Sequence, residues 1–232
     1  MNTLPFTFAD ADLRALPSGA LFWPDPGCLI VADLHLGKSA RVARLGGAAL
    51  PPYDARETLS RLSDDLSATG ARQVICLGDS FDFLDADTVL PEADLLLLTR
   101  MQAGVDWVWI AGNHDPGPVN LGGSHRAELA QGGLVFRHIA TPMAAAEVSG
   151  HYHPKVRLAL RGRAVARPCF LFDDRRLILP AYGAYTGGLF VDAPALAGLM
   201  SPAAEVILTG SAMARLPVHR LAPLRGTLTR GQ

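Results

Sequence analysis

Short apolar runs that each end in a polar cluster recur along the first half of the chain. Residues 29–32 lead into Asp33, residues 74–77 lead into Asp79, and residues 107–111 lead into Asn113. Continuous β-branched and aromatic runs of this length are typical of strands buried on both faces. Between them, residues 53–68 and 87–103 carry helical patterns of leucines opposite charges. This alternation predicts a layered α/β sheet with the polar clusters at the carboxyl ends of its strands.

The pattern changes after about residue 133. Strand-like segments cover residues 135–136, 155–160, 169–172, 177–179 and 206–208, and turn residues separate several of them. This spacing predicts a second, largely antiparallel sheet. No linker or repeat interrupts the chain, so we expect one α/β domain over residues 1–232. The expected architecture is a four-layer αββα sandwich, with two mixed β-sheets flanked by helices.

The composition indicates a protein that works in the cytoplasm without a membrane. No apolar stretch reaches the roughly 18 residues of a membrane span, and the run at residues 28–32 is too short for a signal peptide. The three cysteines are odd in number and widely spaced, and each lies in an apolar run. We therefore expect buried free thiols in a reducing compartment, and neither a disulfide framework nor a zinc knuckle.

The net charge of −1 conceals an asymmetry. Residues 1–150 carry a balance of −8 and residues 151–232 a balance of +7, from these basic side chains: Lys155, Arg157, Arg161, Arg163, Arg167, Arg175, Arg176, Arg215, Arg220, Arg225 and Arg230. A positive C-terminal third would suit an anionic ligand such as DNA. The alternative is an ordinary solvated surface in an arginine-rich protein.

The polar clusters hold the side chains that are the best candidates for metal binding and catalysis. They comprise Asp33, His35, Asp79, Asn113, His114, Asp115, His138, His151 and His153. Asp33 and His35, like His151 and His153, alternate along an extended segment and project to the same side. Seven oxygen or imidazole donors with one shared carboxylate are enough for two metals. This donor set suits manganese, iron or zinc, and the absence of cysteine from it disfavours a closed structural zinc site.

The order of these blocks resembles the calcineurin-like metallophosphoesterases. The matching segments are Asp33-Leu34-His35, Gly78-Asp79, Gly112-Asn113-His114-Asp115, His138 and Gly150-His151-Tyr152-His153. The resemblance implies a phosphoesterase with two divalent metal ions, Mn²⁺ first, with Zn²⁺ and Fe²⁺ as alternatives. It assigns Asp33, His35 and His153 to one ion, and Asn113, His138 and His151 to the other. Asp79 would bridge them, His114 would donate a proton to the reacting oxygen, and Asp115 would orient His114.

A narrower resemblance extends over most of the chain. Residues 33–38, 149–154 and 179–188 are similar to segments of the bacterial ligase-associated DNA-damage-response phosphoesterases. That likeness implies an endonuclease or phosphodiesterase in DNA repair, with DNA as partner. It also implies a functional association with an ATP-dependent DNA ligase, a helicase and an exonuclease.

Several residues admit two interpretations. His125 is the alternative to His138 as a ligand. Lys38 and Arg41 would touch a substrate phosphate or simply begin a solvated helix. Tyr182 and Tyr185 would stack on a base or pack beneath their loop. The acidic run Asp82, Asp85 and Asp87 is expected to be solvated, although Asp82 could hydrogen-bond a metal ligand.

Two other functions remain open at this point. A phosphodiesterase or phosphatase for small or cyclic nucleotides would fit the nearly neutral overall charge. A metal-bound scaffold without catalysis would be expected to lack a ligand or the Asn-His pair, and every expected position is filled.

Overall fold

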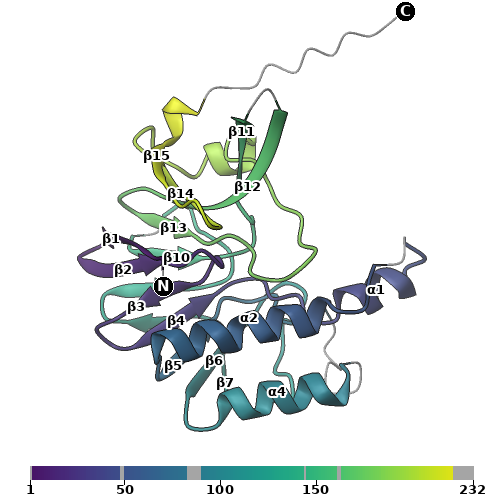
Figure 1. The fold of residues 1–232 in the computed structure, drawn as a ribbon. Helices are drawn as coiled ribbons and strands as arrows, with labels where there is room; N and C mark the ends of the chain where they lie inside the picture. The colour runs from purple at the N-terminus through teal and green to yellow at the C-terminus, as the bar shows by residue number, and fades with distance from the viewer. Residues whose placement is uncertain (1, 48–49, 83–89, 144, 161–162, 222–232) are drawn as a thin grey trace, which may run out of the picture.

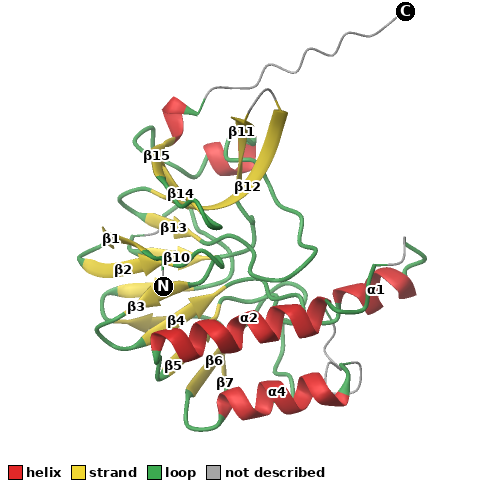
Figure 2. Cartoon of the chain, viewed as in Figure 1, coloured by secondary structure: helices red, strands yellow, loops and turns green. Residues whose placement is uncertain are grey.

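The computed structural model describes residues 2–47, 50–82, 90–143, 145–160 and 163–221. Two β-sheets pack face to face, and the longer helices lie on the outer side of the first sheet (Figures 1 and 2). Five residues named above, Asp85, Asp87, Arg161, Arg225 and Arg230, lie outside the described residues. None of the described helices is long and apolar enough to cross a bilayer.

The first sheet has seven strands in chain order, antiparallel from β1 to β4 and parallel from β4 to β7. Its strands are β1 (Leu4–Phe8), β2 (Ala11–Ala15), β3 (Leu21–Trp23), β4 (Cys28–Val31), β5 (Gln73–Cys76), β6 (Asp106–Ile110) and β7 (Ser124–Arg126). All residues of β4, and all but the first of β5 and β6, are buried, as expected for strands covered on both faces.

The second sheet has eight strands and is mixed, with antiparallel pairs in the majority. Its strands are β8 (Leu129–Gln131), β9 (Leu134–Phe136), β10 (Glu147–Ser149), β11 (Lys155–Leu160), β12 (Arg163–Phe172), β13 (Arg176–Ile178), β14 (Glu205–Leu208) and β15 (Arg215–Pro217). Among the strands of the described residues, β11 pairs with β12, and its first residue, Lys155, also forms a bridge to Phe190. The β11–β12 hairpin extends beyond the rest of the sheet (Figure 1).

The helices are distributed unevenly over the two outer faces. Helices α1 (Lys38–Arg44), α2 (Asp54–Thr69) and α4 (Glu92–Gln102) lie on the side of the first sheet. Helix α2 buries Leu59 and Leu62 against that sheet, and Gly70 ends it in the left-handed conformation that favours glycine. The outer face of the second sheet is covered by the short helices α5 (Pro194–Ala197) and η1 (Val218–Arg220) and by loops.

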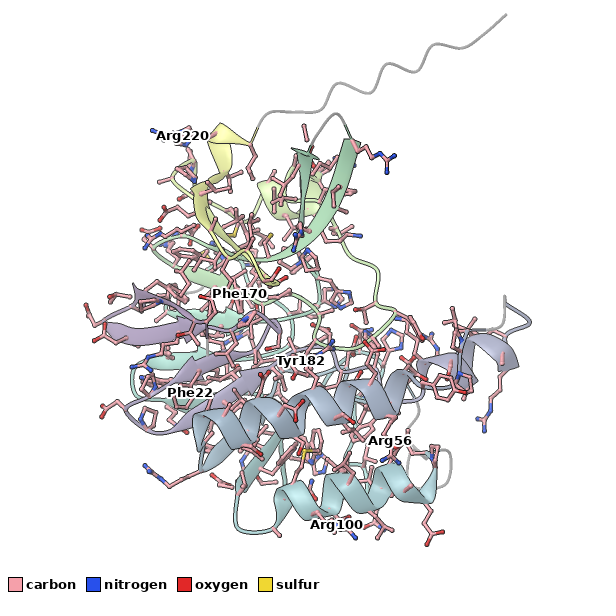
Figure 3. All side chains as sticks on the ribbon, in the orientation of Figure 1. Phe22, Arg56, Arg100, Phe170, Tyr182 and Arg220 are labelled. Atoms are coloured by element: carbon pink, nitrogen blue, oxygen red, sulfur yellow. The ribbon has the colours of Figure 1, made fainter. Side chains whose placement is uncertain are left out.

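Three apolar cores match these layers. The first lies between the sheets and joins Phe6 and Ile75 to Phe170 and Ile207 (Phe170 is labelled in Figure 3). The second lies between the first sheet and helices α2 and α4, and the third lies on the outer face of the second sheet. The three cysteines are buried and free, as the sequence predicts.

The predicted strands and helices are confirmed, including the change to a largely antiparallel second sheet, although β12 begins at Arg163 and not at residue 169. The predicted helix at residues 87–103 corresponds to α4, and its first three positions lie outside the described residues. Strands β1 to β3, β7, β8, β10 and β15 were not predicted. For β1 and β2 the signal is present, because both alternate buried and exposed positions.

One residue of the predicted basic surface belongs to the core instead. The Arg176 side chain is 3% exposed and donates to the backbone carbonyl oxygens of Thr141, Pro142 and Leu199. A buried guanidinium with these partners joins the segment at residues 141–142 to Leu199 and is not available to an external ligand. This corrects the prediction that Arg176 guides DNA.

We predict that Arg176→Ala lowers the free energy of unfolding by about 3–5 kcal/mol, because it leaves several buried carbonyl groups without partners. Arg175→Ala is the matched control, since Arg175 is exposed and adjacent; it should change stability by at most about 0.5 kcal/mol. Urea unfolding followed by circular dichroism measures both. Equal effects of the two variants would contradict the structural role of Arg176.

Candidate metal centre

The candidate ligands meet because three parallel strands end at the same level. In the register of the first sheet, Val31 pairs with Cys76, and Cys76 pairs with Trp109. The loops that follow carry Asp33 and His35, then Asp79, then Asn113 and His114. Strands β9 and β10 of the second sheet lead to His138 and to His151 and His153. Each candidate ligand therefore follows the carboxyl end of a strand, as the sequence predicts.

The backbone of these loops is held in an unusual conformation. Asp33, His35, Asp79, His151 and His153 all have positive φ angles, between 46° and 71°. This left-handed region costs a residue with a side chain about 1–3 kcal/mol, and such residues concentrate at functional sites. Backbone hydrogen bonds stabilise it here, from His35 N–H to Asp79 O (2.9 Å) and from Asp33 N–H to Gly78 O (3.2 Å).

Carboxylates of the site accept backbone N–H groups from neighbouring loops. Asp33 Oδ2 accepts from His151 N–H at 2.9 Å, and Asp79 Oδ1 accepts from His114 N–H at 2.8 Å. The loops pack closely around these bonds, since a Cβ atom on Gly112 would lie 2.1 Å from the Asp79 nitrogen. Glycine is therefore required at position 112.

The side chains gather in two groups. Donor atoms of Asp33, His35 and His153 lie within 4.8 Å of one another, and so do those of Asp79, His138 and His151. His153 Nε2 lies 3.1 Å from Asp33 Oδ1, and His138 Nε2 lies 3.3 Å from Asp79 Oδ2. Asn113 joins the second group, with its Oδ1 3.0 Å from His138 Nε2.

The histidine tautomers favour metal binding. His138 Nδ1 donates to the Leu77 carbonyl oxygen at 2.8 Å, and His35 Nδ1 donates to the Asp82 carboxylate at 2.9 Å. Each of these hydrogen bonds directs the other ring nitrogen, Nε2, toward the donor group to which the histidine belongs. Histidines in metal sites likewise donate their second N–H to an acceptor. Nε2 of His35 is buried without a hydrogen-bond partner among the described residues. The donor set therefore fits two divalent ions.

Burial and charge act in opposite directions on the ionisable groups. Burial acts to raise the pKa of Asp79, but the His138 side chain and the His114 N–H outweigh it and lower that pKa below its ordinary value. Burial acts to lower the pKa of His138, and the Asp79 and Asp33 carboxylates raise it above the usual range. Asp79 is therefore held ionised, which a metal ligand requires.

His114 is placed beside the two groups and belongs to neither. Its side chain is 24% exposed, its Nε2 lies 3.9 Å from Asp79 Oδ2, and its Nδ1 lies 3.7 Å from Asp82 Oδ1. Burial, with a contribution from Arg41, lowers the pKa of His114. An accessible imidazole next to the ligands can exchange a proton with a bound molecule.

Asp115 has a different position from the one predicted. Its carboxylate accepts the backbone N–H groups of Gly112, Asp79, Ser80 and Phe81. Burial raises the pKa of Asp115 to about 6 despite these bonds. Two other carboxylates lie near the His114 ring, Asp82 at 3.7 Å from Nδ1 and Asp79 at 3.9 Å from Nε2, and Asp82 also accepts from His35. Asp115 therefore braces the loops, and Asp82 and Asp79 are the carboxylates placed next to His114.

Tyr182 does not line the site. It is 1% exposed, its hydroxyl donates to Asp65 at 2.9 Å, and Arg61 lies over its ring and bonds its carbonyl oxygen. Tyr182 thus packs its loop against α2 (Figure 3), and the prediction that it stacks on a base is wrong. The same loop supports the centre, since Gly183 N–H donates to Asp33 O at 3.0 Å.

The other residues with open interpretations lie as follows. His125 is on β7, stacked on Trp109, and is in neither metal group. Lys38 begins α1, and Arg41 Nη1 lies 3.8 Å from Asp82. Tyr185 is 42% exposed. Substrate contact by Lys38, Arg41 and Tyr185 stays a prediction.

Of the predicted basic cluster, Arg157 pairs with Asp192 and Arg215 pairs with Glu205. Arg157 also stacks on the ring of Phe190, with its guanidinium carbon 3.4 Å from the ring centroid. These two arginines are therefore committed to contacts within the second half of the chain. Arg163, near the tip of the β11–β12 hairpin, is exposed.

Comparisons with known proteins agree with this arrangement. The family model described as calcineurin-like phosphoesterase matches residues 28–159, more than half of the chain. Among solved structures, the nuclease MPE of Pseudomonas putida matches with 28% sequence identity and a TM-score of 0.73, covering 93% of this chain and 100% of that one. No curated protein matches.

A second solved structure, Yfce, a phosphoesterase from E. coli, is more distant. It matches with 11% identity and a TM-score of 0.37, over 82% of this chain and 98% of that chain. At this level the likeness carries no argument about the site.

We predict two divalent ions per chain, with Asp79 contributing to both sites. Protein purified without chelators should approach two ions by elemental analysis, and Asp79→Ala should lose at least one of them. Asp174→Ala, at an exposed position outside both groups, serves as the control and should keep both. A single tightly held ion that survives Asp79→Ala would contradict the dinuclear site.

Proposed function

The chain belongs to the calcineurin-like phosphoesterase family and is a metal-dependent phosphoesterase, and from this premise we propose that it cleaves DNA by phosphodiester hydrolysis. The observation that carries the proposal is the pair of adjoining donor groups, each made of one carboxylate and two imidazoles. Asn113 and the accessible His114 lie at the same edge. Family membership favours an enzyme over the alternative of a scaffold without catalysis.

The residues of the site would have different roles in the reaction. Asp33, His35 and His153 would hold one ion, and Asn113, His138 and His151 the other, with Asp79 between them. The ions would stabilise the charge on the phosphate oxygens and lower the pKa of a water molecule. His114 would give a proton to the leaving oxygen, because its ring is accessible and lies beside the Asp79 and Asp82 side chains.

Two basic segments begin next to candidate ligands, which supports a polyanionic substrate. Helix α1 starts three residues after His35 and carries Lys38 and Arg41. Strand β11 starts two residues after His153 and leads through its hairpin to the exposed Arg163. A phosphate backbone lying across the site could contact both segments. The likeness to a solved nuclease over nearly the whole chain supports the same assignment.

The biological setting is part of this proposal. We propose manganese as the working metal and bacterial DNA repair as the process, with a functional link to an ATP-dependent ligase, a helicase and an exonuclease. The resemblance of residues 33–38, 149–154 and 179–188 supports this setting, and a cytoplasmic location would accompany it. Hydrolysis of small or cyclic nucleotides is the alternative, favoured by the nearly neutral net charge.

We predict that His114→Ala lowers the rate of DNA cleavage by about 10²–10⁴-fold, the usual scale of general acid–base catalysis. Metal content should remain near the wild-type value, because His114 lies outside both donor groups. Rate and bound metal are measured on the same preparation. Loss of metal together with activity would show that His114 is a ligand.

We predict that Lys38→Ala combined with Arg163→Ala makes the salt dependence of DNA binding shallower by about one unit per lost phosphate contact. DNA cleavage should fall, while turnover of bis(p-nitrophenyl) phosphate should stay near wild type. The control is Arg14→Ala, an exposed arginine on β2, which lies on the opposite side from α1 (Figure 1). Unchanged DNA binding and cleavage in the double variant would favour the small-nucleotide alternative.

A further inference from the structure

A cavity of about 300 Å³ opens beside the second donor group. Its walls include Gly112, Asn113, Glu128, Arg137, His138 and Ile139. Asn113 and His138 belong both to this cavity and to the candidate metal centre, so the cavity adjoins that centre. Its volume is at the lower end of the roughly 300–1,000 Å³ typical of small-molecule sites.

The polar wall of the cavity is formed by Arg137 and Glu128, which are ion-paired with each other. Arg137 Nη2 lies 2.9 Å from Glu128 Oε2, and its Nε lies 3.2 Å from Glu147 Oε2. Glu147 is 1% exposed and also accepts the N–H and hydroxyl of Thr141, so it anchors the guanidinium. The Arg137 side chain remains 26% exposed and the Glu128 side chain 58% exposed.

The apolar wall is Ile139, which follows the candidate ligand His138 directly. It is 42% exposed, although most large apolar side chains of the described part are buried. A ligand that covers the Ile139 side chain would remove apolar surface from water. Because this surface is exposed in the folded protein, the free energy of its burial would stabilise the complex with the ligand.

The two walls together match the chemistry of a nucleobase. Its flat face is apolar and would pack on Ile139. Its edge carries acceptors that an arginine can bond and amino groups that a glutamate can accept from, the pairings proteins use to contact bases. A second phosphate is a poorer occupant, because Arg137 is balanced by two carboxylates.

We propose that this cavity binds the nucleobase next to the scissile phosphate, with Ile139 against its face and Arg137 and Glu128 along its edge. The inference rests on the proposed function, since it requires a nucleic acid substrate. It makes the nucleotide beside the cleaved bond a determinant of where the enzyme cuts.

The test is a cycle of substrate and protein changes on single-stranded oligodeoxynucleotides. One substrate has all its bases, and two others carry an abasic nucleotide on either side of one linkage. For wild type, one of the abasic substrates should lower kcat/KM at that linkage by about five- to tenfold, the scale of one lost buried contact. Ile139→Ala should lower kcat/KM on the complete substrate by a similar factor and cause no further loss on that abasic substrate.

Two controls separate this role from a general defect. An oligodeoxynucleotide with abasic nucleotides on both sides of the linkage has no base at either position, so its cleavage by Ile139→Ala should stay within about twofold of wild type. Leu96→Ala changes an apolar side chain of similar exposure, 50%, on α4, and should leave all substrates unaffected.

The outcomes distinguish the two proposals. If wild type cleaves none of the oligonucleotides, the DNA function itself fails, and the base site fails with it. If wild type cleaves them but neither abasic substrate nor Ile139→Ala changes the rate, the base site alone is overturned. The base site is also overturned if Ile139→Ala lowers cleavage of the abasic substrates by the same factor as cleavage of the complete substrate, because Ile139 would then act independently of the base.

Discussion

The site depends on carboxylates that accept backbone N–H groups across loop boundaries. Asp115 takes the N–H of Asp79, while Asp79 takes the N–H of His114, so the loops after β5 and β6 are tied in both directions. Asp33 ties the loop after β4 to the loop after β10 through the N–H of His151. Charge-assisted bonds of this kind are stronger than neutral ones, and they are needed where the backbone is strained. Without them, the side chains of the two donor groups would not converge.

This constraint explains why a strained backbone and a buried cluster of ionisable groups can coexist. Five candidate ligands have left-handed backbone conformations, and such strain persists only where the surroundings over-determine it. The parallel register of β4, β5 and β6 provides the rigid base, and the loop around Gly183 supports Asp33 from the other side. His114, which we propose as the proton donor, keeps a side chain that is 24% exposed, whereas the Asp79 side chain beside it is 4% exposed.

Much of this arrangement could be predicted from the sequence, because apolar runs followed by Asp, Asn or His are local patterns. These patterns predicted the parallel strands, the helices between them and the residues that converge at the candidate metal centre. The alternation in β1 and β2 was equally local and was overlooked. Contacts between distant segments could not be predicted: Tyr182 with Asp65, Arg176 with three carbonyls, and Asp82 and Asp79 rather than Asp115 next to His114. Nothing in the local sequence distinguishes a buried arginine from an exposed one, or shows that residues 128 and 137 share a cavity wall.

The central claim is that the two donor groups hold two ions joined by Asp79. It is tested most directly by anomalous diffraction from crystals grown with manganese. The account predicts two peaks about 3.5–4 Å apart. One peak would contact Asp33, His35 and His153, the other Asn113, His138 and His151, and both would contact Asp79. A single peak, or two peaks that share no Asp79 oxygen, would contradict it.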